Sequence, residues 1–187
     1  MPSTHILKRR ARAGFSLVEV SVAMCVMVVA LSALVSSLVA SSGMHRVSSE
    51  TAIAQRAAVQ LLEQMQGAPF AEIYRAYNAT TADNAGLTIA PPGANFAVAG
   101  LDPAPGDVDG VCGEIQFPDV DVAGVLQLRE DAVDADLGMP RDLDLDAVVD
   151  GANHSTDYVL LPVRILVRWR GVSGVRELEL ESVLCER

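Results

Sequence analysis

Acidic side chains are the residues of this sequence best suited to chemistry, and one loop region concentrates them. Asp142, Asp144 and Asp146 alternate with leucines. Ca²⁺ binds several oxygen ligands from a flexible loop, so these three carboxylates are a candidate calcium site. However, Ala147 stands where an EF-hand loop requires glycine, and no glutamate closes the loop. Solvated acidic loops are therefore the favoured interpretation, and we expect no cofactor beyond this candidate calcium.

A second short stretch carries the residue types of a hydrolase. His154, Ser155 and Asp157 include a base, a nucleophile and an acid. Near neighbours in sequence cannot generally adopt the geometry of a catalytic triad, and no nucleophile motif accompanies them. The sequence also contains no glycine loop that would cradle phosphate and no His/Cys spacing typical of a metal site. We therefore predict that the protein is not an enzyme.

One carboxylate occupies an unusual place near the N-terminus. Glu19 is the only acidic or basic residue from Phe15 to Ala40, a segment of 26 mostly apolar residues. As a helix this segment would extend about 39 Å, enough to cross a hydrocarbon core of roughly 30 Å. A carboxylate near hydrocarbon is rare unless it has a partner or a task. We therefore expect a transmembrane helix in which Glu19 has a function.

Charge is divided unevenly around this segment. Four basic residues precede Phe15, which leaves a net charge of −14 for the rest of a chain whose total is −10. Positive charge before a membrane segment keeps that end in the cytoplasm, so the C-terminal body is expected outside it. So acidic a body repels phosphate, which argues against nucleic-acid binding. A conventional signal peptide cut near Ala40 is the alternative, but the apolar run is longer than usual and contains Glu19.

The residues around this glutamate form a known motif. Gly14-Phe15-Ser16-Leu17-Val18-Glu19 follows a short basic leader, and it resembles the processing site of type IV prepilins and of the pseudopilins of type II secretion. The resemblance implies that a prepilin peptidase cuts between Gly14 and Phe15 and methylates the new Phe15 amine. It also implies that Glu19 docks on the N-terminal amine of a neighbouring subunit. The alternative is that Glu19 only reaches the nearby cytoplasmic interface, which its spacing would equally allow.

The same resemblance implies a structural role. We expect a minor pilin or pilin-like subunit of a type IV pilus, whose partners are other pilins or pseudopilins, an inner-membrane assembly platform and membrane lipid. The protein would span a bacterial inner membrane once, with its C-terminal domain in the periplasm, before it enters a filament. Within the family, the alternative is a minor pseudopilin of a type II secretion system. From another class, the alternative is a single-span membrane-anchored binding protein that never assembles.

Four segments follow from the patterning. They are a leader at 1–14, a transmembrane or filament-core helix at 15–40, an amphipathic extension at 41–67, and an extracytoplasmic domain at 68–187. In the extension, apolar or small side chains recur every three or four residues as far as Met65, and Gly67 with Pro69 signals the helix end. The expected fold class is α+β: a pilin-like lollipop, with a long N-terminal helix packed on a small antiparallel β-sheet domain with long loops.

The clearest pattern in the last segment is a C-terminal hairpin. Residues 159–169 alternate apolar and mixed side chains, and a second strand follows a turn at 171–174. We expect its apolar face to cover the helix stripe, with Arg164 or Arg168 across from glutamates on the outer face. Shorter strands are expected at 86–89, 114–117 and 124–129.

Three cysteines complete the candidate residues. Cys25 lies in the apolar helix, whereas Cys112 and Cys185 lie in the acidic body. An oxidising compartment makes Cys112 and Cys185 the natural disulfide pair. Their bond would close a loop of about 73 residues and add roughly 4 kcal/mol of stability by the chain-entropy estimate. Two free thiols are the alternative, because the sequence does not define the distance between them.

Overall fold

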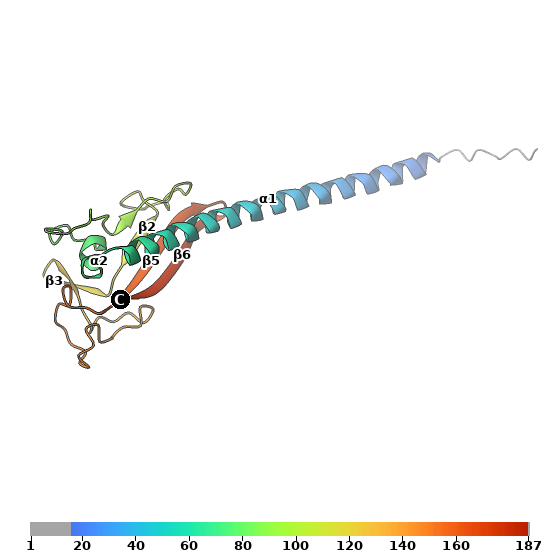
Figure 1. Ribbon diagram of the computed structural model, residues 1–187. Coiled ribbons are helices and arrows are strands. Elements are labelled where there is room, and N and C mark those ends of the chain that lie inside the picture. The colour runs from blue at the N-terminus through green and yellow to red at the C-terminus, as the bar shows by residue number, and fades with distance from the viewer. Residues whose placement is uncertain (1–15, 187) are drawn as a thin grey trace, which may run out of the picture. The chain divides into compact units, whose positions relative to one another are not determined.

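The computed structural model describes residues 16–186. The chain forms two compact units, of which the first ends at Met44 and the second begins at His45. A single helix, α1 (Leu17–Gly67), begins in the first unit and ends in the second (Figure 1). The predicted extension at 41–67 ends at the same residue, Gly67. Pro69, two positions after Gly67, has no N–H to donate to the helix, which explains why α1 ends there. The predicted leader at 1–14 lies outside the described residues.

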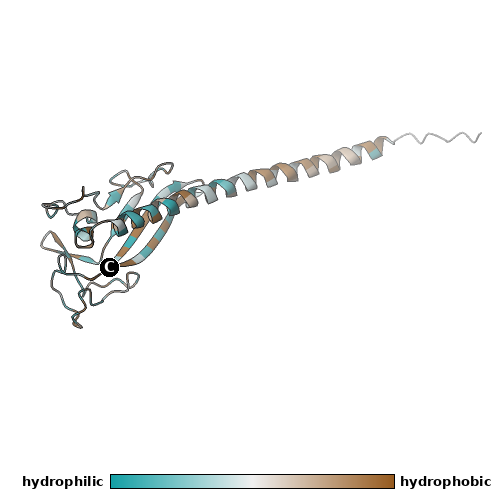
Figure 2. Cartoon of the chain, in the orientation of Figure 1, coloured by the Kyte–Doolittle hydropathy of each residue, from teal (hydrophilic) through white to brown (hydrophobic). Residues whose placement is uncertain are grey.

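In the first unit, α1 is apolar and uncovered. Its most apolar 18-residue window has a mean hydropathy of 2.5, and none of that window is buried. Figure 2 colours this half of the helix mostly brown, for hydrophobic. The hydroxyls of Ser21 and Ser36 donate to carbonyls one turn earlier in the same helix, both at 2.9 Å, so they need no outside partner. One helix near the N-terminus is therefore long and apolar enough to cross a membrane.

In the second unit, the last turns of α1 supply the helical side of a hydrophobic core. Ala54, Ala58, Leu61 and Met65 are at most 7% exposed. Spacings of four, three and four residues keep these side chains on one face, which confirms the predicted stripe. The two alanines add little bulk, so the backbone of the helix can approach the side chains that it covers.

A short helix, α2 (Phe70–Tyr77), follows α1 and was not predicted from the sequence. Pro69 precedes its first residue, where the missing N–H of proline removes no helical hydrogen bond. Tyr74 packs its ring against Phe117, with centroids 5.4 Å apart and nearly perpendicular planes. The Tyr158 hydroxyl donates to the carbonyl of Phe70 at 2.5 Å. Eight residues carry too little periodicity for recognition, and it is packing that stabilises so short a helix.

The strands form a four-stranded antiparallel sheet and a separate two-stranded hairpin (Figure 1). In order across the sheet, the four strands are β1 (Asn95–Phe96), β2 (Gly113–Gln116), β5 (Leu160–Gly171) and β6 (Gly174–Cys185). The hairpin pairs β3 (Asp119–Val122) with β4 (Val125–Leu128). A long apolar N-terminal helix and a small antiparallel sheet domain are thus both present, as the α+β expectation requires.

Most of the strand predictions are confirmed. The C-terminal hairpin, β2 and β4 lie within one or two residues of their predicted bounds. The strand predicted at 86–89 is wrong, because these residues form turns and irregular structure. Leu87 and Ile89 instead pack against the core from a loop, so their apolar character reflects burial and not strand pairing. The sequence did not predict β1 and β3, which are too short to show a clear alternation.

Alternation along β5 sends two kinds of side chain to opposite faces of the sheet. The set that joins the helix stripe in one core is at most 1% exposed and consists of Leu161, Val163, Ile165, Val167 and Trp169. On the outer face, Arg164 lies across from Glu181, and Arg168 lies across from Glu177, as predicted. Arg164 also forms an ion pair with Asp134 at 2.8 Å. This contact ties the long loop after β4 to the sheet.

The predicted disulfide between Cys112 and Cys185 is not present, and both residues are free thiols in the structure. The carbonyl of Cys112 accepts the N–H of Arg168, whereas Cys185 is paired with Leu160 in the register of β5 and β6. Arg168, beside Cys112, and Leu160, beside Cys185, are eight positions apart on β5. At roughly 3.3 Å per residue, this spacing corresponds to about 26 Å. A disulfide requires Cα atoms within about 7 Å of each other. The extended hairpin therefore keeps the two cysteines apart.

The burial of Asp119, the first residue of β3, can be tested through the pH dependence of protein stability. Burial raises its pKa to about 6. A carboxyl whose pKa is higher in the folded state contributes stability at low pH, and that contribution is lost as pH rises from about 4 through 6. We expect Asp119→Asn to raise the thermal unfolding midpoint at pH 7 by about 3 °C, since the side chain is only partly buried. Fluorescence of Trp169, the single tryptophan, reports unfolding of the core.

The advantage of the Asp119→Asn variant should largely disappear near pH 4, where the wild-type carboxyl is protonated in the folded state and about half protonated in the unfolded state. Asp121→Asn is the matched control, because this neighbour lies on the same strand and is exposed. An equal rise for both variants, or a difference that persists at pH 4, would show that the burial of Asp119 is not the cause.

Candidate functional site

Glu19 lies in the first turn of α1 and is the only acidic or basic side chain between Leu17 and Met44. Its neighbours Leu17 and Val18 are 83% and 69% exposed, so the carboxylate belongs to an uncovered apolar surface. A helix N-terminus favours a negative charge, which suits this position. The predicted processing residues Gly14 and Phe15 lie outside the described residues.

The structure brings the predicted acidic trio together on the long loop after β4. Oxygens of Asp142, Asp144 and Asp146 lie within 4.8 Å of one another. Asp142 accepts the N–H of Leu145 at 2.6 Å and that of Ala147 at 2.7 Å. Leu145 and Ala147 adopt φ angles of 65° and 72°, which residues other than glycine rarely do. The trio therefore already serves to shape turns, and calcium binding there stays a prediction.

Beside the trio lies a carboxylate that sequence reasoning missed. Glu130 is 0% exposed. Its Oε1 accepts the N–H groups of Leu143 at 2.5 Å and Asp144 at 3.3 Å, and its Oε2 accepts that of Asp150 at 3.1 Å. A buried carboxylate is stable only where donors or cations replace its lost water. Glu130 is thus the internal anchor on which this loop is folded.

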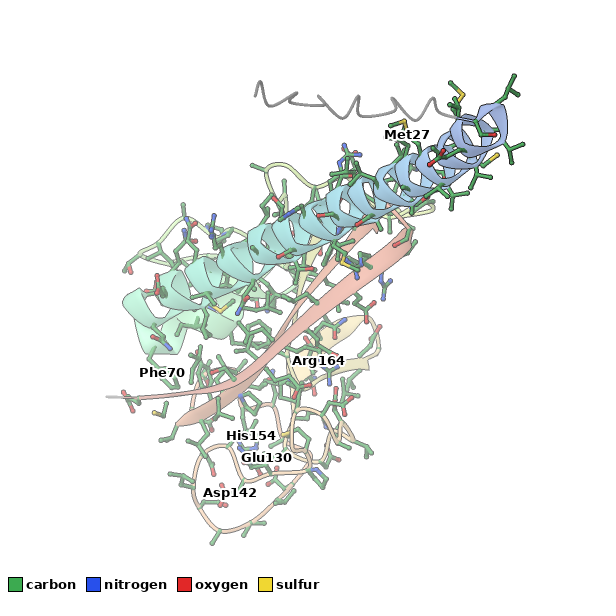
Figure 3. All side chains as sticks on the ribbon, turned by 90° about the vertical axis from the view of Figure 1, so that its right-hand side faces the viewer. Met27, Phe70, Glu130, Asp142, His154 and Arg164 are labelled. Carbon is green, nitrogen blue, oxygen red and sulfur yellow. The ribbon has the colours of Figure 1, made fainter. Side chains whose placement is uncertain are left out.

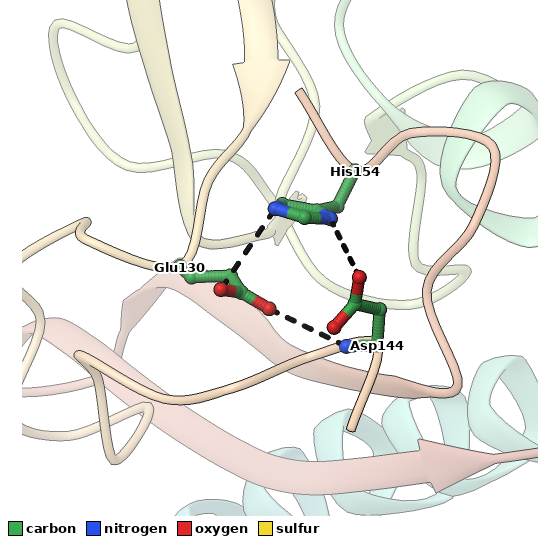
Figure 4. Close-up of side chains that lie close together, drawn as sticks. All are labelled: Glu130, Asp144 and His154. Carbon is green, nitrogen blue, oxygen red and sulfur yellow. Dashed lines mark hydrogen bonds and ion pairs between the residues drawn. The ribbon is translucent and has the colours of Figure 1, made fainter. Parts of the chain in front are cut away.

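His154 lies near Glu130 (Figure 3), with its imidazole between Glu130 and Asp144 (Figure 4). Asp150 and Asp157 lie beside the same ring. The His154 side chain is 7% exposed. Its Nε2 lies 3.8 Å from Glu130 and 3.3 Å from Asp150. Its Nδ1 lies 3.7 Å from Asp144 and 3.3 Å from Asp157. In the described part of the chain, this buried Nδ1 makes no hydrogen bond.

Burial, hydrogen bonds and neighbouring charges together shift the pKa values of His154, Asp150 and Asp144. Burial lowers the pKa of His154, but the hydrogen bond with Asp150 and the nearby negative charges outweigh burial and raise it above its ordinary value. The N–H of Ala152 and the contact with His154 lower the pKa of Asp150. The N–H of Asp146 lowers the pKa of Asp144, but burial and neighbouring carboxylates raise it more, so its pKa lies above the ordinary value. The cluster is therefore dominated by negative charge.

The hydrolase-like residues do not assemble into a triad within residues 16–186. Asp157 lies beside the ring of His154, as an orienting acid would. The backbone of Ser155, however, donates to Asn153, and no hydrogen bond between the Ser155 hydroxyl and the ring occurs in the described residues. Both ring nitrogens face carboxylates, so neither is directed at a nucleophile.

The link between Glu130 and His154 was not visible in the sequence. The available signals were a glutamate directly after an alternating strand and a histidine within an acidic loop. Because the chain between them is irregular, no periodicity connects positions 130, 144 and 154. Only the hydrogen bonds that Glu130 accepts bring these positions together.

Comparisons with known proteins add no further constraint on the site. No family model, no curated protein and no solved structure matches this chain. Function therefore has to be inferred from α1 with Glu19 and from the side chains of the second unit.

Proposed function

We propose that this protein is a minor pilin or pilin-like subunit, processed by a prepilin peptidase and assembled into a type IV pilus. One observation carries the proposal. An uncovered apolar helix has Glu19 in its first turn and begins two residues after Phe15, which follows Gly14 in the sequence. The backbone groups of such a helix are satisfied internally, so it is stable in lipid. Its side chains can equally be covered by neighbouring apolar helices, as the core of a filament requires.

Glu19 supplies a reason for two subunits to associate. A charged carboxylate costs about 2.5 to 3.5 kcal/mol at the centre of a bilayer on insertion scales, and less near its edge. Cleavage after Gly14 would create a new cation, the α-amine of Phe15. Pairing between this amine in one subunit and Glu19 in the next offsets the cost in a medium of low dielectric constant. One such pair per subunit would also define the axial register of the helices.

The second unit supports the proposal as a separately stabilised domain. Its core joins the stripe of α1 to the apolar face of β5, and Arg164 ties the long loop to the sheet. Positive charge before the membrane segment predicts that this domain faces the periplasm. There its acidic loops would be displayed on the filament surface, in pilus biogenesis, adhesion or motility.

The mass of the mature N-terminal peptide tests the proposal. We expect a peptide that begins at Phe15 and carries one added methyl group. The Gly14→Ala variant should keep its leader, because the peptidase reads the glycine before the cut. Gly43→Ala is the matched control: it alters a helical glycine where an added Cβ has nothing within 4 Å, and it should be processed normally.

Two results would contradict this account. An intact Met1, or a cut near Ala40, would favour the single-span anchored protein that never assembles. Normal removal of the leader from Gly14→Ala would show that the motif is not a peptidase site. A correctly processed protein found with a type II secretion pore, and absent from surface pili, would favour the minor pseudopilin.

A further inference from the structure

The cluster around His154 carries more negative charge than the cations near it can balance. Four carboxylates lie within 4 Å of the ring, so the group has a net charge of −3 even with a protonated imidazole. Among residues 16–186, no arginine forms an ion pair with any of these four carboxylates. Arg129 pairs with Asp131 at 2.6 Å, and Arg164 pairs with Asp134 at 2.8 Å. Within residues 16–186, His154 is the only cationic side chain within 4 Å of Glu130.

Nδ1 of His154 supplies a second and independent observation, because it lies 3.3 Å from Asp157 without forming a hydrogen bond to it. Nε2 lies within hydrogen-bonding distance of Asp150, at 3.3 Å. A proton on Nε2 leaves a lone pair on Nδ1, which is buried and has no hydrogen-bond partner among the described residues. A histidine that binds a metal through one nitrogen commonly has its other nitrogen held by a carboxylate. His154 has this arrangement, with Asp150 in the orienting role.

We propose that Glu130, Asp144 and His154 bind a first-row divalent metal ion of the Zn²⁺ type. One potential ligand atom from each residue lies within 4.8 Å of the other two. Figure 4 shows Asp144 on the Nδ1 side of the ring and Glu130 on the Nε2 side, so the Glu130 carboxylate must turn toward Nδ1 to complete the site. Two ligands of a tetrahedral zinc are about 3.4 Å apart, since each lies roughly 2.1 Å from the ion. The distance from Nδ1 to Asp144 is 3.7 Å, close to that separation.

The identity of the ligands favours zinc over calcium. Ca²⁺ and Mg²⁺ prefer sites built from oxygen, whereas imidazole suits Zn²⁺ and its neighbours in the first transition row. The acidic trio offers oxygen alone and shares only Asp144 with the proposed site. Zinc binding should therefore depend on His154, while Asp146 should contribute only to the trio. A bound ion would join three segments of the loop that are now held through Glu130.

Calorimetric titration of the full chain in detergent, after removal of metals with a chelator, tests the site. We expect one zinc ion per chain. His154→Asn should weaken zinc binding by about a hundredfold and Asp144→Asn by at least about tenfold. His45→Asn and Asp146→Asn are the matched controls and should retain wild-type affinity, because His45 lies on α1 and Asp146 belongs to the trio alone.

A stability measurement supplies a second readout. Saturating Zn²⁺ should raise the unfolding midpoint reported by Trp169 fluorescence in wild type, but not in His154→Asn. If His154→Asn does not fold, Asp144→Asn decides the matter, since its side chain is 21% exposed and easier to replace. Absence of zinc binding in wild type, unchanged affinity in the folded variants, or equal affinity for Ca²⁺ would overturn the proposal.

Discussion

Glu19→Ala should mature and insert normally yet enter filaments about tenfold less often than wild type, or not at all. The variant keeps the processing residues Gly14 and Phe15, and it makes the membrane segment more apolar. Membrane insertion should therefore not suffer. What it loses is the partner for the amine of the next subunit. The amount of the variant in a sheared filament fraction, relative to the membrane fraction, measures the effect.

The size of this effect follows from simple electrostatics. Two unit charges 4 Å apart attract by about 4 kcal/mol at an effective dielectric constant of roughly 20. A net loss of only about 1.4 kcal/mol already lowers incorporation tenfold. Glu19→Gln separates charge from shape, because glutamine has nearly the same size but no charge. We expect Glu19→Gln to fail like Glu19→Ala, and Glu19→Asp to recover part of the incorporation.

Glu63→Ala is the matched control for these variants. Glu63 lies on the same helix, is exposed and belongs to the second unit. Its removal should leave processing, insertion and incorporation unchanged. Wild-type incorporation of Glu19→Ala would show that the glutamate does not dock subunits, even if the processing of the N-terminus is as proposed.

Glu130→Ala should have the largest effect on the second unit, with a loss of about 3 kcal/mol in the free energy of unfolding. Three backbone N–H groups that now donate to this carboxylate would lose their acceptor, in a place that is buried at Leu143 and partly buried at Asp144 and Asp150. An unsatisfied buried polar group costs about 1 to 3 kcal/mol, and water that enters the space left by the side chain would offset part of the sum. We expect the unfolding midpoint to fall by about 10 °C.

The measurement should be made with a chelator present, so that loss of a bound metal does not add to the effect. Fluorescence of Trp169 follows unfolding of the core, and loss of protease resistance between positions 129 and 157 follows release of the loop. Glu114→Ala is the control, because Glu114 is exposed on β2 and should be replaced at little cost. A Glu130→Ala protein as stable as wild type would show that the carboxylate does not anchor the loop.

Regular elements with a strong local pattern were predictable from the sequence. The stripe ending at Met65 and the stop at Gly67 and Pro69 are encoded within a few residues of each other. So is the alternation of β5, because side chains two residues apart lie on one face of a strand. That Arg164 or Arg168 would lie across from a glutamate followed from that alternation and from the short turn, and the register pairs Arg164 with Glu181. Where the pattern was short, as in α2 and β3, prediction failed.

The cysteines show where local reasoning ends. The expected oxidising compartment and the presence of two cysteines in the acidic body favoured a disulfide between Cys112 and Cys185. A disulfide, however, also depends on the distance between its cysteines. That distance was determined by the length of β5 and by which strand pairs at each of its ends. Neither quantity is contained in the two residues or in their spacing along the chain.

By itself, the sequence determined the long apolar helix, the place of Glu19 within it and the amphipathic hairpin, because each depends on the period of a single element. The tertiary structure alone decided that Glu130 and His154 meet. Their loop has no regular period, and its course depends on backbone groups that donate to one buried carboxylate. Contacts of that kind join residues far apart in the chain, so they become visible only once the chain is folded.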